Sequence, residues 1–233
     1  MSVAERLKQL KSRVHECCLI CGRDPATVRL LAVSKLHLFS SVREAAAVGQ
    51  VDFAENYVQE ALGKMEEAAD LKVRWHFIGR IQSNKERALA GAGFAAIHSI
   101  DRASIAEALN ALVPDGQRQD IFLQFNAGAE LSKGGVVEEL DLENLFHFVV
   151  EHCLRLRVLG LMVMPPLGQP SRPFFARART LQARLRGMQV QDLHPMDQLS
   201  MGTSHDFAEA IAEGATWLRI GTDIFGQRSN SGL

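Results

Sequence analysis

The chain has 233 residues, and 47% of them are hydrophobic, which is enough to bury a sizeable core in one domain. The 26 basic and 27 acidic residues almost cancel, and 6% of the residues are aromatic, so nucleic acid is not expected as the main partner. No apolar run is as long as a membrane span, and the charged start MSVAERLKQLKSRV is not typical of a signal peptide. These features predict a cytoplasmic protein that binds neither nucleic acid nor membranes.

The first predicted element is a helix from Ser2 to Cys21, in which apolar residues recur at helical spacing and Gly22 follows as a stop signal. Its end carries three of the four cysteines, in the sequence CCLIC. These thiols resemble half of a metal site, but no second cluster with ligand spacing accompanies them, so we expect small buried apolar groups instead. The absence of a disulfide pattern fits a reducing compartment.

Beyond Gly22, short apolar runs typical of buried strands alternate with amphipathic segments typical of helices. The predicted strands cover residues 28–34, 51–56, 73–79, 94–100, 120–126, 157–164, 198–202 and 215–221. The predicted helices between them cover residues 40–49, 57–69, 83–91, 102–112 (capped by Asp101), 140–153, 173–186 and 204–214.

This alternation predicts parallel strands joined by crossover helices, and eight such units in this length favour an α/β fold, a single (β/α)8 TIM barrel. A doubly wound sheet is the alternative, and the absence of a G-x-G-x-x-G motif argues against its dinucleotide-binding form. We therefore expect one domain over residues 1–233, with an extra helix over 1–22 and the barrel over 28–228.

A lysine stands where the first predicted strand ends, in the stretch LLAVSK at residues 30–35. Chemistry in a barrel gathers at the carboxyl ends of its strands, so Lys35 would lie at the mouth of an apolar interior. Partial burial lowers the pKa of an amine, and a neutral amine can attack a carbonyl and form a Schiff base. The alternative is a lysine that reaches solvent or pairs with a carboxylate such as Glu55.

Small and hydroxyl-bearing residues follow the last two predicted strands, in LSMGTS (199–204) and in the Gly221-Thr222 pair. Loops after strands seven and eight form the recurrent phosphate site of this architecture, and a helix starting near Ser204 would add its N-terminal dipole. Arg219, just before the second loop, would point inward at the strand end. Its alternative role is a structural ion pair with Glu55 or Asp206.

A lysine facing a phosphate site across one mouth predicts a ligand that carries both an aldehyde and a phosphate, and pyridoxal 5'-phosphate (PLP) fits. Arg219 would then donate to the pyridine nitrogen and keep it unprotonated. That would weaken the ring as an electron sink, because a protonated pyridinium withdraws carbanion charge more strongly.

Motifs over most of the chain resemble those of the pyridoxal phosphate homeostasis protein family, whose members are similar to an alanine racemase barrel without its second domain. The matching stretches are AVSK (32–35), ENYVQE (55–60), WHFIGRIQSNK (75–85), HSID (98–101), SKGG (132–135), GLMVM (160–164), LSMG (199–202) and RIGTDIFGQR (219–228).

The resemblance implies a role for each of eight residues. Lys35 would carry PLP covalently as an internal aldimine, and Arg219 would face the pyridine nitrogen. Asn56 and His76 would lie near the ring. The phosphate would be held by the following residues: Ser200, the backbone around Met201, Gly221 and Thr222. No metal is implied.

Three positions depart from the family pattern. Ala54 stands where glycine is usual, His37 stands where a basic rim residue is usual, and Thr203 stands where methionine is common. A serine usual in the stretch FNAGAELSKGG (125–135) is also missing. These departures bear on ligand exchange and leave Lys35 and the phosphate loops in place.

The resemblance implies a PLP-binding protein of vitamin B6 homeostasis that holds PLP as an exchangeable aldimine, with PLP-dependent apo-enzymes as candidate partners. In two-domain racemases the second domain supplies a tyrosine to the other face of the cofactor, and the only tyrosine here is Tyr57, in the second βα unit. Loss of a positioned acid–base group costs roughly 10²–10⁴-fold in rate, so robust racemization is not expected. The racemase dimer contact would also be missing, which favours a monomer.

Two other functions remain open from the residues. One is a small PLP-dependent amino-acid racemase with Lys35 as its base. The other is a barrel enzyme in which Lys35 forms a Schiff base with a sugar phosphate, and such a protein would carry no chromophore.

Overall fold

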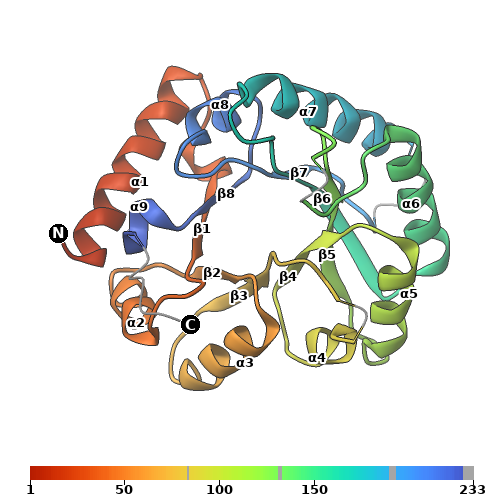
Figure 1. Cartoon of the computed structure of the whole chain (residues 1–233), viewed down its shortest axis with the longest axis horizontal. Coiled ribbons are helices and arrows are strands. Elements are labelled where there is room, and N and C mark those ends of the chain that lie inside the picture. Colours follow the sequence, from red (N-terminus) through yellow and green to blue (C-terminus); the bar gives the residue numbers. More distant parts are fainter. Residues whose placement is uncertain (83, 131–132, 189–192, 228–233) are drawn as a thin grey trace.

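The computed structural model describes residues 1–82, 84–130, 133–188 and 193–227, and eight parallel strands close into a barrel in chain order (Figure 1). The strands are β1 Arg29–Val33, β2 Asp52–Glu55, β3 Arg74–Phe77, β4 Ala96–Ile100, β5 Gln119–Phe125, β6 Leu156–Val163, β7 Gln198–Ser200 and β8 Trp217–Ile220. The first strand pairs with the last, and Leu31 lies opposite Arg219. The predicted (β/α)8 barrel is confirmed.

Helices surround the barrel and cover its outer face (Figure 1). They are α1 Val3–Ile20, α2 Phe39–Ala47, α3 Val58–Glu67, α4 Glu86–Ala90, α5 Ala103–Leu112, α6 Glu139–His152, α7 Arg172–Gly187, α8 Phe207–Ala212 and α9 Thr222–Phe225, with a 3-10 turn η1 at Pro25–Thr27. The prediction of a helix over 204–214 was too long, because residues 204–206 form a turn before α8 begins at Phe207. The short α9 was not predicted.

The predicted first helix is confirmed as α1, and its sequence explains where it begins and ends. The Ser2 side chain accepts from the Glu5 N–H and the Glu5 carboxylate accepts from the Ser2 N–H, which is a capping box. Gly22 follows with φ 66°, the left-handed conformation that ends many helices. The buried face of α1 packs into the core with residues such as Leu7 and Leu10.

The predicted cap of α5 was wrong. Arg102 occupies the N-cap position and makes no side-chain cap hydrogen bond. The Asp101 carboxylate instead accepts from the Arg102 guanidinium at 2.7 Å and from the Gly135 N–H at 3.4 Å. The carboxylate is therefore turned toward the loop after β5 and away from the helix that follows it.

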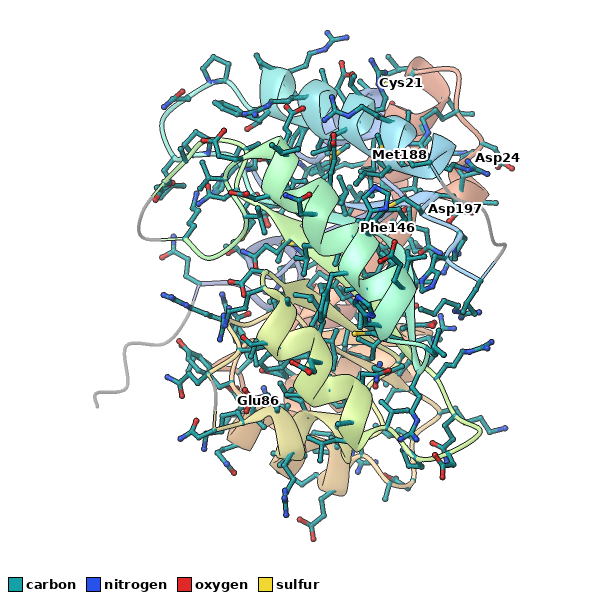
Figure 2. All side chains as sticks on the ribbon, turned by 90° about the vertical axis from the view of Figure 1, so that its right-hand side faces the viewer. Cys21, Asp24, Glu86, Phe146, Met188 and Asp197 are labelled. Atoms are coloured by element: carbon teal, nitrogen blue, oxygen red, sulfur yellow. The ribbon has the colours of Figure 1, made fainter. Side chains whose placement is uncertain are left out.

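The core has two layers, and Figure 2 shows how densely side chains fill the space between barrel and helices. The outer layer lies between strands and helices and includes the buried Phe146 of α6 (labelled in Figure 2). The inner layer fills the barrel, with an apolar part made of Leu31, Val33, Ala54, Ala96, Phe122, Leu159, Met162 and Trp217. In the described part of the chain, every helix is too short or too polar to traverse a bilayer.

Candidate functional site

A cavity of about 390 Å³ opens at the carboxyl ends of the strands. Its lining comes from residues at or just after six of the eight strands, together with the loops after β5, β7 and β8. The lining residues are Val33, Lys35, His37, Asn56, Ile78, Arg80, Gln124, Lys133, Gly134, Met162, Met164, Thr203, Ser204, His205, Arg219, Gly221, Thr222 and Gly226. The structure thus brings together five of the eight predicted site residues: Lys35, Asn56, Arg219, Gly221 and Thr222.

The other three predicted site residues lie away from this lining. His76 is buried in the barrel interior, where its ring centroid is 5.0 Å from that of Trp217. The Ser200 hydroxyl is fully buried, and the Met201 N–H donates to the Trp217 carbonyl at 3.0 Å. The Met201 side chain belongs to the outer core layer.

Thr203 and Ser204 belong to the predicted phosphate stretch LSMGTS but were not among the eight predicted site residues, and they line the cavity in place of Ser200 and Met201. The turn that places them passes through Gly202 with φ 92°, where an added Cβ would lie 2.6 Å from the Ala210 Cβ. The Ser204 hydroxyl accepts from the Asp223 N–H at 3.3 Å and so joins the loop after β7 to α9. The two predicted phosphate loops are therefore neighbours, with their hydroxyls on one wall.

The backbone around Lys35 is held in an unusual conformation. Leu36 has φ 62°, a left-handed conformation that few residues other than glycine adopt. Its N–H donates to Glu60 Oε1 at 2.6 Å. That hydrogen bond fixes the turn immediately after Lys35.

A buried charge cluster holds the other side of the same turn. The Lys64 ammonium of α3 donates to the Ser34 carbonyl at 2.7 Å, to Glu55 Oε1 at 2.8 Å and to Glu60 Oε1 at 2.7 Å. The Ser34 hydroxyl donates to Glu55 Oε1 at 2.6 Å. Burial raises the pKa of the Glu55 carboxyl, and the Lys64 and Ser34 contacts act against that rise. Glu55 is therefore part of this cluster, which holds Ser34 and Leu36, the two residues that flank Lys35.

Asn56 lines the cavity and carries a buried, unsatisfied polar atom. Its Oδ1 is buried and has no hydrogen-bond partner in the described structure. A buried acceptor left without a donor costs free energy, so such an atom marks a place for a ligand or a water. Gly79 packs directly on this residue, since an added Cβ there would lie 1.8 Å from the Asn56 carbonyl oxygen.

Arg219 reaches the cavity from the inner face of β8. Its guanidinium donates to the Val163 carbonyl at 2.8 Å and to the carbonyl and hydroxyl oxygens of Ser200, the latter at 3.1 Å. Burial lowers the pKa of Arg219 to about 10, so it remains a cation at neutral pH. The barrel itself holds this side chain, and neither Glu55 nor Asp206 forms the ion pair considered from the sequence.

The cavity thus combines a primary amine, a guanidinium, an amide and two hydroxyl-bearing loops. Such a set suits a small ligand that carries a carbonyl and an anionic group. Three residues of the predicted motifs, Ser83, Ser132 and Arg228, lie outside the described residues.

Comparisons with known proteins cover almost the whole chain. A family profile described as "Alanine racemase, N-terminal domain" matches residues 6–229. Proteins named "Pyridoxal phosphate homeostasis protein" from Pseudomonas aeruginosa and Aquifex aeolicus are 46% and 40% identical, over 97% and 98% of this chain and 96% and 99% of theirs.

Solved structures give the same result. PipY of Synechococcus elongatus is 37% identical, covers 97% of this chain and 100% of its own, and has TM-scores of 0.85 without PLP and 0.82 with PLP bound. An alanine racemase from Corynebacterium glutamicum, at 18% identity and a TM-score of 0.67, shares the fold over 99% of this chain and 62% of its own. The chain belongs to the alanine racemase N-terminal domain family and, within it, to the pyridoxal phosphate homeostasis proteins.

Proposed function

We propose that this chain binds PLP in the cavity at the carboxyl mouth of the barrel and serves vitamin B6 homeostasis as a carrier of the cofactor. The observation that carries the proposal is the convergence of Lys35, Arg219 and the hydroxyl loops on one cavity. The PLP-bound state of PipY, 37% identical to this chain, supports it.

The residues present fit the cofactor. When bound, PLP supplies an aldehyde that condenses with a primary amine, and Lys35 is the amine that we assign to it. Asn56 also lines the cavity, and we assign its unpartnered Oδ1 as an acceptor that a donor group satisfies when the ligand is bound. We assign Arg219, which lines the cavity, as the donor to the pyridine nitrogen, where its positive charge disfavours a proton.

The phosphate is assigned to the wall formed by the two loops. Thr203, Ser204, Gly221 and Thr222 all line it. Gly221 lies against β1, where an added Cβ would be 3.1 Å from the Val33 carbonyl oxygen, so a larger residue would crowd the loop. Ser200 and Met201 lie buried behind this wall. Ser200 accepts hydrogen bonds from Arg219 and so helps to hold that side chain.

A carrier is favoured over a racemase by the position of Tyr57. Racemization needs acid–base groups on both faces of the cofactor, and the only tyrosine of the sequence is 55% exposed and lies outside the cavity lining. Removing one positioned acid–base group costs roughly 10²–10⁴-fold. We assign the protein to the cytoplasm, in keeping with its four free thiols. We further propose that it is a monomer and that PLP-dependent apo-enzymes receive the cofactor from it.

Hydride trapping tests the covalent assignment. Purified protein with PLP should show an absorbance band that borohydride removes, and intact-mass and peptide analysis should then place one adduct on Lys35. Lys35→Ala should lose the adduct, whereas Lys133→Ala, which removes another cavity lysine, should keep it. An adduct that persists in Lys35→Ala overturns the assignment.

A second assay separates carrier from racemase. The PLP-loaded protein should restore activity to a PLP-dependent apo-enzyme while it racemizes alanine and serine no faster than free PLP does. Racemization well above free PLP would favour the enzyme instead.

A further inference from the structure

A chain of hydrogen-bonded side chains crosses the barrel interior from its amino mouth to the cavity. At the amino end of β2, Asp52 Oδ1 lies 3.2 Å from His76 Nε2. His76 Nδ1 lies 3.0 Å from His98 Nε2, and His98 Nδ1 lies 2.9 Å from the Ser200 hydroxyl. That hydroxyl accepts from Arg219, whose guanidinium lines the cavity.

With both histidines neutral, the chain has one consistent direction of donation. Asp52 accepts two N–H groups from Arg74, at 2.7 and 2.8 Å, and is a carboxylate, so it also accepts from His76 Nε2. His76 Nδ1 is then an acceptor and receives the Nε2 proton of His98. His98 Nδ1 in turn receives the only hydroxyl proton of Ser200, whose oxygen remains free to accept from Arg219. Both neutral rings are therefore protonated on Nε2.

Burial agrees with this assignment. His76 is 3% exposed and His98 is fully buried, stacked on Phe122 at 4.2 Å between ring centroids. Burial lowers the pKa of both rings, that of His98 further through His76 and Arg219. Barrel interiors are usually filled by layers of branched apolar side chains, and a buried polar group is stable only when it is hydrogen-bonded.

We propose that Asp52, at the opposite mouth of the barrel, is a distal positioning residue that fixes the Arg219 guanidinium in the cofactor cavity through His76, His98 and Ser200. The inference rests on the proposed cofactor site and deepens it. Asp52 determines the tautomer of His76, which in turn determines the tautomer of His98. His98 then takes the hydroxyl proton of Ser200, so that the Ser200 oxygen accepts from Arg219.

The structure supplies a matched control on another pair of strands. Asp120, in β5, accepts from Arg157 at 2.6 and 2.7 Å, in the same two-point geometry that Arg74 makes with Asp52. No histidine contacts Asp120 within the described residues. Asp52→Leu and Asp120→Leu therefore remove equivalent cross-strand ion pairs, and only the first interrupts the hydrogen-bonded chain.

The test compares the two variants by nitrogen-15 NMR of the cofactor-free protein. Wild type and Asp120→Leu should show His76 and His98 as Nε2-protonated neutral rings, with slowly exchanging Arg219 guanidinium protons. In Asp52→Leu the two histidines should show mixed tautomers, and the guanidinium protons of Arg219 should exchange faster with solvent. An Nδ1-protonated His98 in wild type, or equal effects of the two variants, would overturn the proposal.

PLP titration provides the second readout. Asp52→Leu should weaken PLP binding about tenfold, the scale of one lost hydrogen bond to a charged group, and Asp120→Leu less than twofold. If Asp52→Leu does not fold, His76→Phe replaces it with the same expectation. Absent PLP binding in wild type would refute the cofactor site while the NMR result still stands, and unchanged binding in both chain-breaking variants would refute the positioning role alone.

Discussion

Lys35 is the residue on which the site depends, and its neighbours show how a barrel places an amine at its mouth. The residue before it and the residue after it are both held by side chains of the stretch ENYVQE and by Lys64. The left-handed Leu36 carries a conformational cost that its hydrogen bond to Glu60 offsets. Side chains of the motif ENYVQE therefore hold the backbone at the end of the motif AVSK, on both sides of Lys35.

Removing Lys64 should damage both stability and binding. Lys64→Met leaves the fully buried Glu55 without its cation, and breaking such a buried pair costs about 3–5 kcal/mol. Urea unfolding should show that loss, and PLP titration should show weaker binding because the Lys35 turn loosens. Lys72→Met, at an exposed lysine, should change stability by no more than about 0.5 kcal/mol.

The double variant Lys64→Met/Glu55→Gln distinguishes charge from packing. It removes the uncompensated carboxylate and should recover part of the lost free energy of unfolding. Equal stability of the single and double variants would show that Lys64 acts through packing alone.

At the scale of elements, the short α9 borders the cavity through Thr222 and is held by α1. Arg6 of α1 donates to the Ile224 carbonyl at 2.7 Å and to the Phe225 carbonyl at 3.2 Å, and Figure 1 shows the two helices side by side. Arg13 adds an ion pair to Asp223 at 2.9 Å. The first helix therefore supports the loop to which we assign the phosphate.

Arg6→Met should release this support. Hydrogen bonds from a charged donor contribute about 1.5–3 kcal/mol each when well buried, and these are partly buried, so a loss of about 1–2 kcal/mol in unfolding free energy is expected. PLP should also dissociate faster, as measured by stopped-flow absorbance. Lys8→Met, on the exposed side of α1, is the control, and equal PLP dissociation from both variants would contradict the role of Arg6.

The sequence predicted the elements well because strand and helix patterns are local. It predicted Lys35, Arg219 and the Gly221-Thr222 pair because these residues lie at or just beyond the carboxyl ends of predicted strands. It assigned the phosphate to Ser200, whereas Ser204 lines the cavity and Ser200 does not. Strands buried on both faces carry no alternating pattern, so their residues do not reveal which side chain points inward. The predicted cap of α5 was wrong for a related reason, because the Asp101 carboxylate accepts a hydrogen bond from Gly135, in a loop distant in sequence.

At the scale of the whole molecule, two neutral histidines at the centre of the barrel couple folding to pH. Burial lowers their pKa in the folded chain, whereas the unfolded chain titrates near 6.5. Below that pH the unfolded chain binds more protons, so stability is full above pH 6.5 and falls as pH decreases toward the native pKa. Each histidine contributes a slope of up to about 1.4 kcal/mol per pH unit.

Denaturant unfolding between pH 7 and pH 5 measures this slope. His98→Phe should reduce the slope by the contribution of one histidine, up to about 1.4 kcal/mol per pH unit, although the variant is less stable at neutral pH. His147→Gln, at an exposed position of α6, should leave the slope unchanged. A slope identical in wild type and His98→Phe would contradict the assignment of a neutral buried ring.

Closure of the barrel joins the two ends of the described chain. The first strand pairs with the eighth, and Arg6 contacts Ile224, 218 positions further on. The loop assigned to the phosphate follows the eighth strand, so its wall is complete only when that strand has paired with the first. The cavity, which takes Lys35 from beyond β1 and Arg219 from β8, is therefore assembled only in the closed barrel.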